Sequence, residues 1–145
     1  METIEETYEY LVTKLNKDIA NGCIKYKGSI TSGLRTVQRN RNVGGHPKSW
    51  HLDDLARDII IDDLDNYNSL SKYLINLGYC IICHDDTLML HIQYNFPIEH
   101  NFERTGHYSH LMHILIKDPK IKENIQKEII KERTKNGKKN QNIGA

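Results

Sequence analysis

The chain has 145 residues, of which 38% are apolar and 27% are charged, and its formal net charge is +1. This size and composition suit one soluble domain, and the small net charge offers no overall attraction for nucleic acid or a membrane. No apolar run reaches the roughly 18 residues of a membrane-spanning helix, and the acidic N-terminus is unlike a secretory signal. The three cysteines form no disulfide framework, so the sequence predicts cytoplasmic synthesis without a signal peptide.

The N-terminal third predicts one helix followed by short extended segments. Apolar residues at steps of three and four predict a helix over 3–20, which the Asn-Gly pair that follows is expected to end. Short strands are predicted at 23–27 and 30–33. Residues 37–50 are rich in polar residues, glycine and proline, and predict a mostly irregular loop.

The middle of the chain predicts a strand, a helix and a hairpin. Residues 55–61 are apolar and β-branched towards their end, as in a strand that enters a core. A helix that Gly78 ends is predicted next, followed by hairpin strands at 79–83 and 87–94. This order predicts an α+β fold with a small antiparallel sheet, flanking helices and a C-terminal helical extension.

The C-terminal third differs in character from the rest. We predict a main domain over 1–97, a His-rich loop and helical extension over 98–134, and a disordered basic tail over 135–145. The helix of the extension is predicted over 111–134, with a break at Asp118-Pro119. The basic tail could contact nucleic acid or an anionic wall polymer, but the preferred interpretation is a tail that is simply exposed to solvent.

One segment carries a pattern typical of a metal site. His51 precedes Asp58 by seven residues, and a second histidine, His91, lies in the middle of a predicted strand. Catalytic zinc takes three protein ligands from His, Asp and Glu and keeps one position open. A His/Asp/His set meets that requirement if the chain folds back between His51 and Asp58. The spacing by itself occurs in many proteins.

Several separated residues around this segment share a wider pattern. They are Ser32, Gly33, Arg35, Val43, Gly44, Gly45, Ser49, His51, Ala56 and Asp58. Together with a later strand histidine, they resemble the zinc D-Ala-D-Ala carboxypeptidase-like metallopeptidases. That family includes VanX-type dipeptidases and phage L-alanyl-D-glutamate endolysins, and it shares a fold with the Hedgehog signalling domain. The resemblance covers roughly residues 28–94.

The resemblance implies a function and a set of site residues. It implies that His51, Asp58 and His91 bind Zn²⁺, that Arg35 holds a substrate carbonyl or carboxylate, and that Ser49 lines the site. The implied reaction is hydrolysis of peptides of peptidoglycan that contain D-amino acids. The implied setting is a phage-encoded protein that is virion-associated or released at lysis, with other virion proteins as partners and no membrane partner.

Three departures from the family pattern concern the loop and the general base. Asp54 stands where the family has a glycine. Leu88 stands where classic members have a Glu three residues before the last histidine, and Gln93 stands where looser members have an acid two residues after it. Leucine and glutamine cannot take a proton from water. The candidate substitutes are His84, Asp85, Asp86 and Glu99. The alternative function is a catalytically impaired member that serves as a structural or binding component of a virion or complex.

Two further patterns have weaker chemical support. Cys80 and Cys83 form a C-x-x-C within a predicted strand, whereas redox motifs lie at helix starts, so no disulfide or metal role is expected. A series of histidines in the C-terminal third resembles a second metal site but has no Cys or acid at ligand spacing. Its members are His100, His107, His110 and His113.

Overall fold

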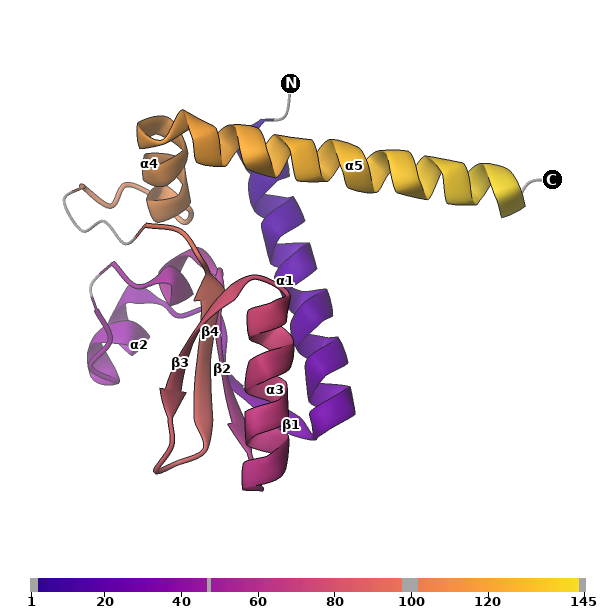
Figure 1. Cartoon of the computed structure of the whole chain (residues 1–145). Helices are drawn as coiled ribbons and strands as arrows, with labels where there is room; N and C mark the ends of the chain where they lie inside the picture. The colour runs from indigo at the N-terminus through magenta and orange to yellow at the C-terminus, as the bar shows by residue number, and fades with distance from the viewer. Residues whose placement is uncertain (1–2, 47, 98–101, 144–145) are drawn as a thin grey trace.

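The computed structural model describes residues 3–46, 48–97 and 102–143. Helices and strands are intermixed in the first two thirds of the chain, and two helices follow (Figure 1). The elements are α1 (Ile4–Tyr26), β1 (Gly28–Ser32), α2 (Val37–Asn42), the 3-10 helix η1 (Trp50–Asp53), β2 (Ala56–Ile61), α3 (Leu64–Asn76), β3 (Tyr79–His84), β4 (Met89–Tyr94), α4 (Ser109–Lys117) and α5 (Pro119–Ile143).

The four strands form an antiparallel sheet in the order β1-β2-β4-β3. The predicted α+β class, with an antiparallel sheet, flanking helices and further helices at the C-terminal end, is confirmed. Asp58 of β2 lies opposite His91 of β4, and Ile82 of β3 lies opposite His91 on its other side. Residues directly opposite in a sheet share one face, so these three side chains lie together on the same face.

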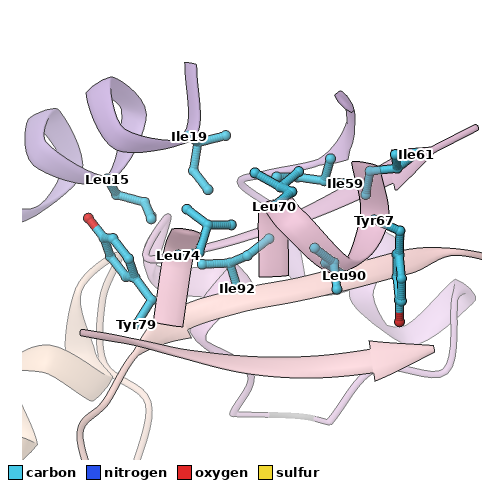
Figure 2. Close-up of a cluster of buried hydrophobic side chains, with 10 residues drawn as sticks. All are labelled: Leu15, Ile19, Ile59, Ile61, Tyr67, Leu70, Leu74, Tyr79, Leu90 and Ile92. Atoms are coloured by element: carbon cyan, nitrogen blue, oxygen red, sulfur yellow. The ribbon is translucent and has the colours of Figure 1, made fainter. Parts of the chain in front are cut away.

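The other face of the sheet packs against α1 and α3 and forms the main core (Figure 2). Alternate residues of the two central strands face this core, because successive side chains of a strand point to opposite faces. The buried residues that build it are Leu15, Ile19, Ile59, Ile61, Tyr67, Leu70, Leu74, Tyr79, Leu90 and Ile92. The helices thus leave the opposite face free for polar side chains.

A second buried cluster joins the C-terminal helices to the loop before β2. Trp50 of η1 and Leu55 just before β2 pack with Leu11 of α1, Leu111 of α4 and Ile125 of α5. None of the described helices combines the length and the apolar character that crossing a membrane requires. The extension is therefore part of one packed unit with the segment that holds His51.

Helix α1 is longer than predicted, and the predicted strand at 23–27 is wrong. The helix continues to Tyr26, and Lys27 ends it in the left-handed conformation with φ 58°. Gly22 is buried inside the helix, where a Cβ would lie 2.8 Å from Cδ1 of Leu70 in α3. Glycine is thus required here because two helices approach closely. It does not end the helix, although the Asn-Gly pair predicted that it would.

The C-terminal helices match the predicted break between them but extend further than predicted. The predicted break at Asp118-Pro119 is present, because α4 ends at Lys117 and α5 begins at Pro119. Helix α5 continues to Ile143, through most of the tail predicted to be disordered. Lysine and glutamine are good helix formers, whereas asparagine and glycine are poor ones, and the extension contains both kinds. The division of the chain after residues 97 and 134 stays a prediction.

Candidate metal centre and its pocket

Three side chains from separate elements converge on the open face of the sheet. His51 lies in η1, Asp58 in β2 and His91 in β4. Oδ1 of Asp58 lies 3.2 Å from Nε2 of His51 and 2.9 Å from Nδ1 of His91. One candidate ligand atom from each residue lies within 4.8 Å of the other two. The structure thus brings the three predicted residues together, while their role as ligands stays a prediction.

The chain between His51 and Asp58 folds back through a left-handed residue. Asp54 has φ 61°, and its backbone N–H donates to the carbonyl of His51. Glycine adopts this conformation without steric cost, and aspartate is one of the few other residues that reach it. The aspartate at the family's glycine position therefore keeps the left-handed turn, and its carboxylate pairs with Arg57 at 3.0 Å.

The tautomer of His51 is fixed by a backbone carbonyl. Nδ1 of this buried ring lies 2.7 Å from the oxygen of Gly33, and because a carbonyl only accepts, Nδ1 carries the proton. The lone pair of Nε2 then points at Oδ1 of Asp58. Two lone pairs that face each other at 3.2 Å require a proton or a cation between them. The donor set of two imidazoles and one carboxylate fits zinc.

His91 is oriented in a similar way by Gln93. Nε2 of His91 lies 2.7 Å from Oε1 of Gln93, which leaves Nδ1 facing Asp58. Hydrogen bonds of this kind fix the ring orientation of metal-binding histidines. From the sequence, Gln93 is notable only because it stands where some family members have an acidic residue. The sequence does contain a signal for this orienting role: Gln93 lies two residues after His91 on the same strand, so the two side chains share one face of the sheet.

The carboxylate of Asp58 is buried and is surrounded by nitrogen atoms of Arg35, His51 and His91. Burial by itself raises the pKa of this carboxyl, but the hydrogen bonds and charges of His51 and His91 lower it by more. The pKa of Asp58 therefore lies well below its ordinary value. Arg35 adds an ion pair from Nη2 to Oδ2 at 2.9 Å. The carboxylate is thus available as an anionic ligand across the physiological range.

Arg35 is itself held in place from three sides. Besides Asp58, its guanidinium donates to Oγ of Ser32 at 3.1 Å and to Oδ1 of Asn40 at 3.3 Å. Asn40 is buried, and its amide also donates to the carbonyl of His46 at 2.6 Å. The sequence predicted a substrate contact for Arg35, and the structure shows a contact with Asp58. Nothing in the sequence pattern pointed to Asn40.

The glycine pair of the family pattern has a steric explanation. Gly44 has φ 73°, which favours glycine. At Gly45 an added Cβ would overlap Oδ1 of Asn40 and would lie 3.1 Å from Nη1 of Arg35. The second glycine therefore leaves room for the hydrogen bond that holds the guanidinium.

A pocket of about 390 Å³ opens above the three converging residues. Ser49 lines it, and its hydroxyl also accepts the N–H of His51 at 3.2 Å at the start of η1, while its role at the site stays a prediction. Three of the lining residues with a titratable side chain were not assigned to this site from the sequence. They are His46, Lys48 and His110.

The four candidates for the general base lie in different places. His84 lines the pocket. Asp85 instead accepts the hydroxyl of Tyr67 at 2.7 Å, and Asp86 is not part of the described lining. Glu99 lies outside the described residues. Only His84 of the four is therefore placed at the pocket by the described part of the chain.

The C-terminal extension forms one wall of this pocket. His110 of α4 is fully buried and stacks on Trp50, with ring centroids 3.7 Å apart. Phe102 stacks on His110 and on His113, and His107 contacts the Tyr8 hydroxyl at 2.7 Å. Position 100 of the histidine series lies outside the described residues. The described members therefore serve in packing and hydrogen bonding around the wall.

The cysteines of the C-x-x-C form no disulfide within the described part of the chain. Cys23, Cys80 and Cys83 are all free thiols. Cys80 and Cys83 lie three positions apart on strand β3, so their side chains point to opposite faces. The expectation that the C-x-x-C has neither a disulfide nor a metal role stays a prediction.

Comparison with known proteins gives one family. Residues 20–91 match the family model described as Peptidase M15. No curated protein and no solved structure matches the chain. The matched segment contains His51, Asp58 and His91, whereas α4 and α5 lie beyond it.

Proposed function

The chain belongs to the peptidase M15 family through residues 20–91, and from this premise we propose that it is a zinc metallopeptidase acting on peptidoglycan peptides that contain D-amino acids. The observation that carries the proposal is the convergence of His51, Asp58 and His91 within 4.8 Å at the floor of a pocket. Peptidases need such an arrangement at the surface, because the scissile carbonyl must reach the metal.

The proposed ligands are supplied by residues whose orientation is already fixed. His51 offers Nε2 because Gly33 holds its other nitrogen, and His91 offers Nδ1 because Gln93 holds its other nitrogen. Asp58 offers one oxygen. A bound zinc ion supplies a Lewis acid for the scissile carbonyl and for water. The protein's part is to hold the ion rigidly beside an accessible cavity.

The lining of the pocket supports a substrate with a negative charge and small apolar groups. Among the described lining residues, Arg35 and Lys48 are the arginine and lysine side chains, and Asp58 is the one acidic residue. Ile82 and Met89 add apolar surface on the same side. A short stem peptide that ends in a D-alanine carboxylate meets both requirements, because cations attract the carboxylate and apolar side chains pack on methyl groups.

A specific observation also favours the alternative of a catalytically impaired member. Leu88, at the classic position of the general base, has φ 51° and packs against the main core. It therefore points away from the pocket. Under this alternative the chain is a structural or binding component of a virion or complex, and α5, which projects beyond the packed unit in Figure 1, is the attachment element.

One experiment separates the two functions. Zinc-loaded protein is incubated with purified peptidoglycan stem peptides of defined length, and the products are identified by mass spectrometry. If the protein is a peptidase, we expect the stem peptide to lose one D-alanine or to be cut at one internal bond, and we expect a zinc chelator to abolish the reaction. Stoichiometric zinc binding with no cleavage of any stem peptide would support the impaired component instead. Phage origin is tested separately, by finding the protein in purified particles or lysates.

A further inference from the structure

The pocket contains several titratable side chains besides the three proposed ligands. Amide hydrolysis needs one group that takes a proton from the attacking water and delivers it to the leaving nitrogen. The family's usual carboxylate is replaced by Leu88 in this chain. The described candidates at the pocket are Arg35, His46, Lys48, His84 and His110.

Two of these candidates have no lone pair to offer. Arg35 is a guanidinium in an ion pair with Asp58. Lys48 is an ammonium group, and it lies 4.4 Å over the ring of Phe102. Guanidinium and ammonium groups donate hydrogen bonds and do not accept them. Both residues suit binding of a negative group rather than proton abstraction.

Two of the histidines are also engaged in ways that oppose the role. Nδ1 of His46 accepts the backbone N–H of Lys48 at 3.1 Å, so its lone pair is used and the other nitrogen carries the proton. His110 is 0% exposed and lies between the rings of Trp50 and Phe102. A side chain packed in this way cannot approach a water in the open pocket.

His84 differs from both in position and in exposure. It is the last residue of β3 and pairs with Met89, two residues before His91 on β4. Its side chain therefore shares the sheet face of His91, at a diagonal separation of about 7–8 Å. The ring is exposed and makes no hydrogen bond to the part of the chain that is described. Its nitrogens are available to a water in the pocket.

We infer that His84 is the general base and acid of the peptidase reaction, an inference that rests on the proposed function. A ring nitrogen of His84 takes one proton from water as the water oxygen bonds to the scissile carbonyl carbon. The carbonyl π electrons move to its oxygen and return as the C–N bond breaks. The His84 imidazolium then gives its proton to the leaving nitrogen, while the other water proton leaves the new carboxyl group to solvent.

Kinetics of two matched variants test this assignment. His84→Gln keeps a polar side chain of similar size at an exposed strand end, and Asp62→Asn changes an exposed residue just after β2 that is not part of the described pocket lining. We expect His84→Gln to lower kcat by about 10²–10⁴-fold with KM and zinc content unchanged, as for other general bases. Asp62→Asn should behave as wild type. A kcat of His84→Gln within twofold of wild type would overturn the inference while leaving the peptidase function in place.

A spectroscopic measurement gives a second readout that does not depend on turnover. Zinc-loaded protein labelled with ¹⁵N-histidine is titrated with a phosphinate dipeptide, whose tetrahedral phosphorus resembles the transition state. The His84 ring signals, assigned by their absence in His84→Gln, should shift as the probe binds. Binding without any shift of these signals would contradict the inference. A wild-type protein that neither cleaves stem peptides nor binds the phosphinate removes the proposed function and the inference together.

Discussion

Arg35 donates from Nη2 to Oδ2 of Asp58 at 2.9 Å, and this contact leaves only Oδ1 of the carboxylate facing the two histidines. The geometry presents Asp58 as a ligand through one oxygen. It also balances a buried negative charge, which costs free energy when it is left alone. Arg35 therefore has a role in the metal site before any substrate binds.

Replacing Arg35 by glutamine should weaken zinc binding. The variant removes the partner that orients Asp58, and loss of such outer contacts typically lowers metal affinity about 10–100-fold. Competition with a chromophoric chelator measures this affinity directly.

Arg39→Gln is the matched control, because Arg39 is an exposed arginine of the neighbouring helix α2. It should leave zinc affinity unchanged. An Arg35→Gln protein with wild-type zinc affinity and a raised KM would show instead that Arg35 acts only on substrate, as the sequence pattern implied.

Asp58→Asn should uncouple the stability of the fold from zinc. A ligand that binds only the folded state stabilises it by about 2.7 kcal/mol when its free concentration is 100 times the dissociation constant. Adding a chelator should therefore lower the melting temperature of the wild-type protein. In Asp58→Asn the melting curves with and without zinc should coincide, because the anionic ligand is lost.

The control for this prediction is Asp62→Asn, an exposed aspartate just after β2. Its melting temperature should respond to zinc as the wild-type protein does. If Asp58→Asn keeps the full response to zinc, the ion is bound elsewhere, and the proposed ligand set is wrong.

Gly45→Ala should damage the site without touching a proposed ligand. The new Cβ would overlap Oδ1 of Asn40, so the hydrogen bond that Arg35 donates to this oxygen must break or the loop must shift. We expect a loss of peptidase activity of about 10-fold or more, since small displacements of positioning groups have large effects on rate. Initial rates on a stem peptide provide the measurement.

Gly106→Ala is a suitable comparison, since a Cβ there would meet only Oγ of Ser109 at 3.9 Å. Its activity should stay near that of the wild-type protein. Equal activity of the two alanine variants would show that the Asn40 contact does not matter for Arg35.

The elements that the sequence predicts best are those with a strong periodic pattern. The strand β2, the helix α3 and the hairpin of β3 and β4 follow directly from apolar spacing and from turn residues. The end of α1 does not, because Gly22 is used for helix packing rather than as a stop. Only the contact with α3, distant in the chain, reveals that difference.

The candidate site divides in the same way. Local spacing and resemblance pointed to His51, Asp58 and His91, whereas their supporting contacts depend on tertiary structure. Arg57 is an example: it is buried in β2 and donates to Asn16 of α1 at 2.7 Å. A buried arginine is rare unless it is paired, but its partner lies 41 positions away and has no sequence signature.

Asp53 connects the site loop to the C-terminal extension and gives the last prediction. Its carboxylate is fully buried, accepts the backbone N–H of Leu111 at 2.8 Å, and pairs with Arg104 at 3.0 Å. Leu111 lies in the first turn of α4, whose own N-cap residue makes no side-chain bond. Asp53 thus caps α4 from a distant part of the chain.

Asp53→Ala should therefore lower the free energy of unfolding by about 1–3 kcal/mol, since a buried cap and the partner of Arg104 are both lost. Chemical denaturation measures this change, with Asp65→Ala on the exposed face of α3 as the control. Because His110 of α4 stacks on Trp50, hydrogen exchange should also increase in η1 next to His51. Faster exchange in α4 with no change in η1 would contradict the mechanical link between the extension and the site.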